Sequence, residues 1–444
     1  IIDQVISHSS DKHAWFSESR QSRTNAKADW YVWADPKPDG TPPNNWLSIF
    51  GGSAWQWDSR RMQYYLHNFL VSQPDLNFHS AEVQDALLAE MRFWLERGVD
   101  GFRLDTVNFY FCSLGFEDNP VVRPDDFNAS TAPAVNPYNF QEHIYDKSRP
   151  ENLAFLKRLR VLMDEYPGRT TVGEIGDSQH QLDIMAQYTS GDDHLHMAYT
   201  FDYLGGEFSA EHFRKSIAAT EAKAPDGWVC LAFSNHDVVR HVSRWAVHGQ
   251  EAAFTRLAAT LILCMRGSVC LYQGEELGLK EAELSFADLV DPYGIEFWPE
   301  FKGRDGCRTP MVWQAHVRNG AFSTAERTWL PVPAEHLVHA VDTQDNIPGS
   351  VLEFYRALLA FRRAHPALAK GTIRLLDAPA NVLAFLREDG TQRLLCVFNM
   401  GGAAAEYALP ADLVPHDAGC PGVTAAPIDG ELDLEPFGSY VGLL

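Results

Sequence analysis

The segment Gly98-Val-Asp-Gly-Phe-Arg-Leu-Asp-Thr106 decides our interpretation of this chain. It is a short apolar run that follows a glycine and ends in a carboxylate, which is typical of a buried strand in a parallel sheet. Two further runs have the same form: Thr171-Val-Gly-Glu-Ile175 contains Glu174, and Phe233-Ser-Asn-His-Asp237 ends in Asp237. The three carboxylates are 69 and 63 positions apart. Each interval is about two βα units at the roughly 30 residues per unit of an eight-stranded barrel.

Side chains at the C-terminal ends of barrel strands meet on one face, where the active sites of such barrels lie. We therefore expect Asp105, Glu174 and Asp237 to meet there. Three acids without an evident set of metal ligands favour a glycosidase, with a nucleophile, an acid/base and a stabiliser of the oxocarbenium-like transition state. A single strand-end aspartate is more often a helix cap or a loop hydrogen bonder. Here Arg103 shares a strand face with Asp105 and favours its ionised form, which supports the catalytic interpretation.

The composition describes a large acidic chain. It has 444 residues, 45% of them hydrophobic and 12% aromatic, enough for a large catalytic domain and a smaller one. A formal net charge of −22 argues against nucleic acid or an anionic membrane as a partner and favours a neutral small-molecule substrate. No run approaches about eighteen consecutive apolar residues, so we expect no membrane-spanning helix.

The cysteines favour a reducing compartment. Their number is odd, no Cys-x-x-Cys pair occurs and several lie inside apolar runs, which indicates buried thiols in a cytoplasmic protein. The seven are Cys112, Cys230, Cys264, Cys270, Cys307, Cys396 and Cys420.

The alternation of strands and helices is interrupted near the start of the chain. Residues 1–6 form the first predicted strand, and residues 9–79 are too long for a plain loop, so they predict an inserted subdomain. Apolar residues at helical spacing then predict a helix from Ser80 that ends before Gly98. Further helices are predicted at 151–166, 181–188, 210–222, 251–265 and 351–364. Further strands are predicted at 196–203, 228–233 and 268–272, and long loops at 106–149 and 292–348.

Six barrel strands can be counted, whereas a closed barrel needs eight. Because the sequence opens inside a strand, we expect two βα units, about 80 residues or more, in an N-terminal segment of the same protein that is missing here. From Thr372 onward, short alternating runs are typical of an antiparallel β-sandwich. The predicted fold is therefore an α/β (β/α)8 TIM barrel of residues 1–8 and 80–370. It carries a subdomain of residues 9–79 inserted after strand 3 and a C-terminal β-sandwich of residues 371–444.

At these residues the chain resembles the α-amylase superfamily, glycoside hydrolase family 13, in its exo-acting α-glucosidase branch of maltases and oligo-1,6-glucosidases. The matching segments follow the family's order along essentially the whole chain. They are Asp3-Gln-Val-Ile-Ser-His8, Phe50-Gly-Gly-Ser-Ala-Trp55, Gln73-Pro-Asp-Leu-Asn77, Gly101-Phe-Arg-Leu-Asp105, Gly173-Glu174, Asn235-His-Asp237, Tyr272-Gln-Gly-Glu-Glu-Leu-Gly278 and Arg304-Asp-Gly-Cys-Arg-Thr-Pro310.

The resemblance implies a role for each acid: Asp105 as nucleophile, Glu174 as general acid/base and Asp237 as transition-state stabiliser. Seven further residues are expected to contact substrate: His8, Arg103, His236, Arg304, Phe50, Phe201 and Thr106. Among these, Arg304 resembles the arginine that closes the non-reducing end of the pocket. Thr106 resembles a linkage switch, at which Thr accompanies α-1,4 preference and Val accompanies α-1,6 preference.

One departure concerns metal binding. Many α-amylases have an asparagine ligand of a structural calcium at the position of Ser7, and serine is a poorer ligand. We therefore expect no metal site in this sequence and no cofactor. A structural divalent cation, where the protein holds one, is expected in the missing N-terminal segment.

The expected activity is that of a retaining α-glucosidase on small α-glucosides, extending to glucosyl transfer wherever an alcohol or sugar outcompetes water. One alternative is a sucrose- or trehalose-directed isomerase or hydrolase of the same superfamily. A second alternative, from another functional class, is an inactive transporter-partner homologue. Such partners typically lack the catalytic acids and have a membrane span, and this chain shows the reverse of both features.

Overall fold

The computed structural model describes residues 1–129, 132–423 and 425–444. The chain forms two compact units. Unit 1 comprises residues 1–201, 223–228 and 299–301, and unit 2 comprises residues 202–222, 229–298 and 302–444.

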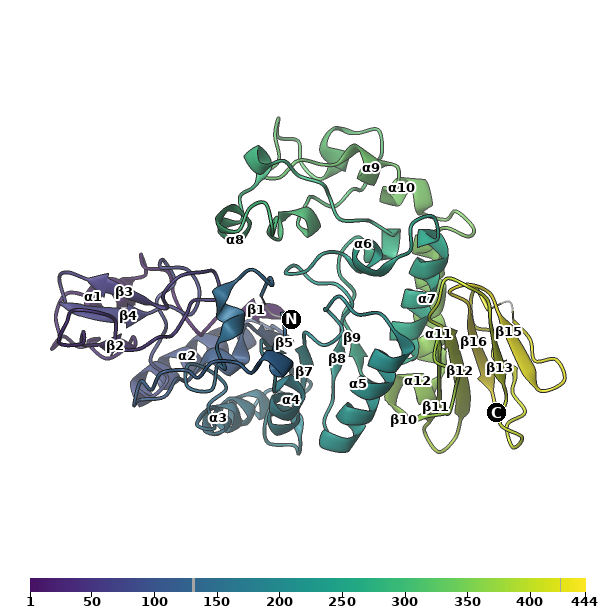
Figure 1. Cartoon of the computed structure of the whole chain (residues 1–444), viewed down its shortest axis with the longest axis horizontal. Helices are drawn as coiled ribbons and strands as arrows, with labels where there is room; N and C mark the ends of the chain where they lie inside the picture. Colours follow the sequence, from purple (N-terminus) through teal and green to yellow (C-terminus); the bar gives the residue numbers. More distant parts are fainter. Residues whose placement is uncertain (130–131, 424) are drawn as a thin grey trace. The chain divides into compact units, whose positions relative to one another are not determined.

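Unit 1 contains a four-stranded parallel sheet in the order β1-β5-β6-β7; β1, β5 and β7 are labelled in Figure 1. The strands are β1 (Ile2–Gln4), β5 (Gly101–Leu104), β6 (Thr170–Ile175) and β7 (Met197–Thr200). The register pairs Leu104 with Gly173 and Glu174 with Tyr199. These are four of the predicted barrel strands, and parallel pairing brings their C-terminal ends to one edge.

Helices connect these strands. They are α2 (Ala81–Leu95), α3 (Asn152–Asp164) and α4 (Gln181–Thr189). The Ser80 side chain caps α2 by accepting from the N–H of Val83, and the α2 face with Val83 and Leu87 is buried. Gly98 has a φ of +89°, which ends the helical course before β5 as the sequence predicted.

The segment of residues 9–79 has its own small core in unit 1. It contains α1 (Ala14–Ser19) and an antiparallel sheet of β2 (Trp33–Ala34), β4 (Gln63–Leu66) and β3 (Trp55–Asp58). Trp46 and Trp55 stack with ring centroids 5.8 Å apart inside this core. The predicted loop of residues 106–149 contains three short 3-10 helices: η1 (Val107–Phe109), η2 (Pro124–Asp126) and η3 (Pro137–Phe140).

Unit 2 contains two further parallel strands and the helices around them. The strands are β8 (Cys230–Leu231) and β9 (Ser268–Val269), and the main helices are α5 (Ala210–Lys223), α6 (His241–Trp245), α7 (Glu251–Cys264), α11 (Val351–Ala364) and α12 (Pro366–Lys370). The final residue of α5 belongs to unit 1.

The prediction of a loop at residues 292–348 is wrong in one respect, because this segment contains short helices. These are α8 (Pro292–Glu296), η6 (Asp305–Cys307), η7 (Arg318–Ala321), α9 (Ala334–Leu337) and α10 (Val341–Gln344), preceded by η4 (Glu275–Leu277) and η5 (Phe286–Asp288). Most span a single turn, too few residues to show a helical period in the sequence.

The C-terminal part of unit 2 contains an antiparallel sheet in the order β10-β11-β12-β16-β14; its first four strands are labelled in Figure 1. Its strands are β10 (Thr372–Leu375), β11 (Val382–Glu388), β12 (Arg393–Asn399), β16 (Ser439–Leu443) and β14 (His416–Asp417). A ribbon of β13 (Ala405–Ala408) and β15 (Glu431–Leu434) shares a core with one face. Residues of the other face share a core with α7 and α11.

A buried arginine fastens this sheet to α7. Arg387 in β11 is fully buried, and its guanidinium donates to the carbonyls of Met265, Gly371 and Thr372. Because Met265 follows α7, Gly371 precedes β10 and Thr372 begins β10, the arginine joins the sheet to the helices of unit 2.

Candidate functional site

Carboxylates gather at the C-terminal ends of neighbouring parallel strands in unit 1. Asp105 directly follows β5, and Glu174 lies near the end of β6, which pairs with β5. Asp3 in β1 lies opposite Arg103 in β5. Because Arg103 and Asp105 are two residues apart in an extended segment, their side chains share one face.

A single guanidinium contacts all three of these carboxylates. Nη1 of Arg103 lies 2.5 Å from Oδ1 of Asp105 and 2.9 Å from Oδ1 of Asp3. Its Nη2 lies 2.6 Å from Oε2 of Glu174, and the Arg103 and Glu174 side chains are 14% and 4% exposed. Burial lowers the pKa of Arg103, but the surrounding acids raise it well above its ordinary value, so the guanidinium stays charged. Three acidic side chains therefore share one cation, so by formal charge the cluster has an excess of negative charge.

Two further groups hydrogen-bond to Glu174. The N–H of Thr106 donates to Oε2 at 3.1 Å, and the hydroxyl of Tyr199 in β7 donates to Oε1 at 2.8 Å. Thr106 adopts a φ of +42° and a ψ of +49°, which is unusual for a β-branched residue. Such backbone strain costs about 1–3 kcal/mol, and the hydrogen bonds of Thr106 help to offset it.

A run of side-chain hydrogen bonds leads from Gln73 to Asp105. Nε2 of Gln73 lies 3.0 Å from Nε2 of His8, and Nδ1 of His8 lies 2.9 Å from Oγ of Ser7. Oγ of Ser7 lies 3.1 Å from Oγ1 of Thr106, which donates to Oδ2 of Asp105 at 3.4 Å. Burial lowers the pKa of His8, against the opposing effect of Asp105, and so favours the neutral imidazole.

Aromatic rings lie beside His8. The ring of Phe69 is 5.3 Å from that of His8 and 5.7 Å from that of Phe50. Phe50 is therefore one ring removed from His8, and together these rings supply an apolar surface next to the charged cluster.

In unit 2, several donors surround one acid, Asp237. Its Oδ1 accepts from Nη1 of Arg304 at 3.0 Å and from Nη2 of Arg308 at 2.9 Å. Its Oδ2 lies 3.3 Å from Nε2 of His236, and Nε of Arg308 donates to the His236 carbonyl at 2.7 Å. Both oxygens of Asp237 therefore have partners within unit 2.

A buried aspartate holds Arg304 in place. Asp291 is 3% exposed, and its two oxygens accept from Nε and Nη2 of Arg304 at 2.9 and 2.8 Å, a bidentate pair. The N–H of Asp291 in turn donates to Oδ2 of Asp305 at 2.8 Å. Burial raises the pKa of Asp291, but Arg304 outweighs this effect and holds it below its ordinary value. The formal charges of Asp237, Asp291, Arg304 and Arg308 cancel.

Eight of the ten predicted site residues fall into these two networks, and the other two are Phe50, whose ring contacts Phe69 beside His8, and Phe201. Phe201 lies immediately after β7, because the expected strand of residues 196–203 ends at Thr200. Sequence reasoning missed six residues of the networks: Asp3, Ser7, Gln73, Tyr199, Asp291 and Arg308. Asp3, Ser7, Gln73 and Arg308 lie inside the segments that carry the family resemblance, which was a usable signal. Tyr199 and Asp291 lie outside those segments.

The donors around Ser7 do not fit a metal ion. The Ser7 hydroxyl is shared between His8 and Thr106. Across the part of the chain that the structure describes, no group of three or more His, Cys, Asp or Glu side chains is arranged to hold a metal. All seven cysteines are free thiols, and six of them are buried. None of the described helices is long and apolar enough to cross a membrane.

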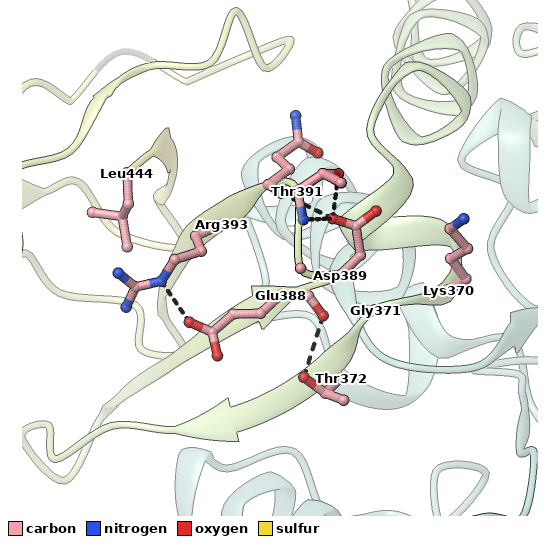
Figure 2. Close-up of a pocket in the computed structure, with 10 residues that line it drawn as sticks. Lys370, Gly371, Thr372, Glu388, Asp389, Thr391, Arg393 and Leu444 are labelled. Atoms are coloured by element: carbon pink, nitrogen blue, oxygen red, sulfur yellow. Dashed lines mark hydrogen bonds and ion pairs between the residues drawn. The ribbon is translucent and has the colours of Figure 1, made fainter.

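A separate surface pocket of about 660 Å³ lies at the hairpin between β11 and β12 (Figure 2). Its lining is polar: Lys370, Gly371, Thr372, Glu388, Asp389, Gly390, Thr391, Gln392 and Arg393, with Leu444. Nε of Arg393 donates to Glu388 at 2.5 Å, and the hydroxyl of Thr391 donates to Asp389 at 2.9 Å (Figure 2). These groups pair with one another, and the lining includes none of the predicted site residues, so we assign no activity to this pocket.

Comparison with known proteins identifies the family. The model of the α-amylase catalytic domain matches residues 1–371. A probable α-glucosidase of Rhizobium meliloti (strain 1021) is 57% identical over 446 residues, which cover 100% of this chain and 80% of that protein. An oligo-1,6-glucosidase of Heyndrickxia coagulans is 32% identical over 453 residues, covering 93% of this chain and 78% of that protein.

Solved structures agree with this result. The α-glucosyl transfer enzyme XgtA superposes with a TM-score of 0.96 at 51% identity, covering 100% of this chain and 82% of that one. The trehalulose synthase MutB from Pseudomonas mesoacidophila MX-45 superposes with a TM-score of 0.84 at 30% identity, covering 99% and 82%. The chain therefore belongs to the α-amylase family of glycoside hydrolases and has that family's TIM-barrel fold, followed by a C-terminal antiparallel sheet.

Proposed function

We propose that the protein is a retaining α-glucosidase that removes terminal, preferably α-1,4-linked, glucose from small α-glucosides. The observation that carries this proposal is the contact of Arg103 with both Asp105 and Glu174, which come from paired strands. A retaining pair needs carboxyl groups about 5–5.5 Å apart. Two acids that share one guanidinium are compatible with that short separation.

In the proposed first step, a carboxylate oxygen of Asp105 attacks the anomeric carbon while Glu174 protonates the glycosidic oxygen, and the bond to the leaving group breaks. This step forms a β-glucosyl ester on Asp105. In the second step Glu174 removes a proton from water, which attacks the same carbon and releases glucose with retained α configuration. Glu174 is suited to both steps because its Tyr199 and Thr106 partners hold it in one orientation.

The excess negative charge of the unit 1 cluster supports this chemistry. Positive charge develops on the sugar ring in the transition state, and fixed carboxylates nearby stabilise it. We assign transition-state stabilisation to Asp237 as well, because its segment resembles that of the family. Its partners His236 and Arg304 are proposed to bind hydroxyl groups of the terminal glucose, Phe50 to wall the pocket, and Phe201 to be a weaker contact.

Glucosyl transfer is part of the proposal. The second step accepts any hydroxyl group that reaches the ester before water does, and the similar enzyme XgtA is described as an α-glucosyl transfer enzyme. A second candidate function is sucrose isomerisation, which is favoured by the similarity to trehalulose synthase. That alternative uses the same acids and differs in the fate of the leaving sugar.

The architecture beyond the described residues is also a proposal. The parallel strands of the described residues number six, four in unit 1 and two in unit 2, whereas a closed barrel has eight. We place the other two βα units in a segment outside this sequence, and we retain residues 9–79 as an inserted subdomain and residues 371–444 as a C-terminal domain. The free thiols support a cytoplasmic location.

Product analysis with the full-length protein tests the function. On an aryl α-glucoside in dilute methanol, where glucose comes only from the cleaved unit, we expect α-glucose as the first sugar product by NMR, together with methyl α-glucoside. First release of β-glucose would show inversion and reject the mechanism. Conversion of sucrose to an isomer, faster than maltose hydrolysis, would favour the second candidate.

A further inference from the structure

We propose that Ser7 and Gln73 are positioning residues that hold the proton of His8 on Nδ1 and direct the hydroxyl of Thr106 at the nucleophile Asp105. The inference rests on the proposed function and deepens it, because it explains how the orientation of Asp105 is controlled. We call the hydrogen-bonded series Gln73, His8, Ser7, Thr106 and Asp105 the Gln73–Asp105 hydrogen-bond chain.

The donor and acceptor roles along the Gln73–Asp105 hydrogen-bond chain are set first at Gln73. The N–H of Leu70 donates to Oε1 of Gln73 at 3.0 Å, which leaves the amide nitrogen to face His8. An amide NH2 group donates and does not accept. Nε2 of His8 must therefore be the acceptor in this pair and carries no proton.

The proton of His8 consequently lies on Nδ1. A neutral imidazole has one N–H, and with Nε2 as acceptor that N–H is at Nδ1, 2.9 Å from Oγ of Ser7. Ser7 is 2% exposed, so its hydroxyl has to find partners within the protein. It accepts from His8, and its own hydrogen is left to donate to Oγ1 of Thr106 at 3.1 Å.

The last donor is the Thr106 hydroxyl. A carboxylate only accepts, so the 3.4 Å contact with Oδ2 of Asp105 is donated by Thr106. Arg103 holds the other oxygen, Oδ1, at 2.5 Å. With a donor on each oxygen, the plane of the Asp105 carboxylate is fixed from two sides. The threonine contact is the longer one and leaves Oδ2 the less tightly held of the two oxygens.

Protonation of His8 breaks the chain. An Nε2–H would oppose the NH2 group of Gln73, whose orientation Leu70 holds. Two titratable groups bear on this histidine: Asp105, at the other end of the chain, and Asp75, whose backbone bridges that of His8. Asp75 is buried, which raises its pKa to about 7, and it accepts from Asn68.

A double-mutant cycle tests the connection between Ser7 and Thr106. We expect Ser7→Ala and Thr106→Val each to lower kcat on an aryl α-glucoside about tenfold, with KM changed much less. The double variant should be no worse than the poorer single variant, since the broken chain has no second link to lose. Thr106→Ser keeps the hydroxyl and should restore most of kcat. Multiplied losses in the double variant, or wild-type kcat in Ser7→Ala, would overturn the proposal.

The pH profile tests Gln73. The Gln73→Glu side chain has nearly the same shape, but its carboxylate accepts a hydrogen bond from Nε2–H and so favours the cationic form of His8. Because protonated His8 breaks the hydrogen-bond chain, the acidic limb of the kcat/KM profile should move to higher pH. Gln73→Met, the matched control, should lower kcat without that movement. If the acidic limb of kcat/KM does not move in Gln73→Glu, the donor and acceptor roles assigned to Gln73 and His8 are wrong. If Ser7→Ala fails to fold, this pH profile tests the proposal by itself.

A failure of the proposed function is recognised separately. Wild-type protein that turns over no α-glucoside rejects the function. The Gln73–Asp105 hydrogen-bond chain is then tested by urea unfolding of the wild type, the Ser7→Ala and Thr106→Val variants and the double variant. A double variant whose midpoint falls no further than that of the worse single variant supports the chain, and additive midpoint shifts reject it.

Discussion

Around Arg103 in unit 1, one cation is shared by three carboxylates, whereas around Asp237 in unit 2 one carboxylate is shared by two arginines and faces a histidine. The first arrangement has an excess of acidic groups, which under the proposed function would stabilise the positive charge of the transition state. The second arrangement, with the carboxylate of Asp291, has balanced formal charges and many fixed donors, which suits neutral hydroxyl groups. The difference shows that the two units surround their acidic groups with opposite balances of charge.

The largest expected effect is at the acid proposed to become esterified. Asp105→Asn should leave the fold intact and lower turnover at least about a thousandfold, because the amide cannot form the glucosyl ester. Steady-state kinetics on an aryl α-glucoside measures this, with thermal unfolding as the control for folding. Retention of a tenth of the activity would reject Asp105 as the nucleophile, and the Arg103 cluster of unit 1 would then have no assigned catalytic role.

The second prediction separates the two roles within the unit 1 cluster. Glu174→Gln should lower turnover of maltose by about 10²–10⁴-fold, because general acid catalysis is lost. The first step should be partly restored with a dinitrophenyl α-glucoside, whose leaving group needs no proton. Pre-steady-state release of the phenol isolates this step from deglycosylation, and equal losses on both substrates would count against Glu174 as the acid.

The third prediction compares the clusters directly. Arg103→Met leaves three carboxylates without their shared cation, whereas Arg308→Met leaves Asp237 with Arg304. Arg103→Met removes the group that orients both proposed catalytic acids, so kcat/KM should fall at least about a hundredfold. Arg308→Met should cost about tenfold. A larger loss of kcat/KM in Arg308→Met than in Arg103→Met would show that activity depends more on the unit 2 cluster.

The fourth prediction concerns Glu275, a buried carboxyl that hydrogen-bonds neutral groups, the N–H of Tyr272 and the hydroxyl of Tyr355. Burial raises its pKa from 4.5 to about 7. The folded state therefore binds this proton more tightly than the unfolded state. Its contribution to stability is fully present below pH 4.5 and is lost as the pH rises toward about 7, by at most about 3 kcal/mol.

The corresponding measurement is the melting temperature at pH 5 and pH 7. The melting temperature of Glu275→Gln should fall less over this interval than that of the wild type. Asp291 should behave in the opposite way, because Arg304 lowers its pKa and the resulting stability is lost only as the pH falls. An identical pH response of Glu275→Gln and wild type would contradict the assignment.

The smallest effect is expected at Thr106, which links the acids of unit 1 through its N–H and hydroxyl groups. Thr and Val have nearly the same shape, so Thr106→Val changes polarity rather than volume. Wild type should prefer maltose over isomaltose, and the variant should shift that ratio about tenfold toward isomaltose. Equal kcat/KM values for the two disaccharides in wild type would end the linkage argument.

Much of this organisation could be predicted from sequence. The predicted helix of residues 351–364 coincides with α11, and the strands before Asp105 and around Glu174 are β5 and β6. Strand bounds were less accurate: the predicted strand of residues 228–233 is only β8, Cys230–Leu231. A strand ends where its partner ends, and that partner lies far away in the sequence.

The site was predictable where neighbours in sequence are neighbours in space. Strand alternation alone is enough to place Arg103 beside Asp105. Tyr199 could not be found in this way, because its pairing with Glu174 depends on the register between β6 and β7. Asp291 escaped detection because it is separated from Arg304 by a segment without regular periodicity.

The sequence by itself determined the order of the parallel strands and helices, the positions of Asp105 and Glu174 at strand ends, and the family resemblance, since each depends on local patterns of apolar, glycine and acidic residues; Asp237, expected at a strand end, instead lies six residues beyond β8. Only the tertiary structure decided that Arg103 serves three carboxylates, that Asp237 receives two arginines, and that Ser7 connects His8 with Thr106. The reason is physical. Hydrogen bonds and ion pairs form within about 3 Å, and strand register and loop path, rather than distance along the chain, bring side chains that close.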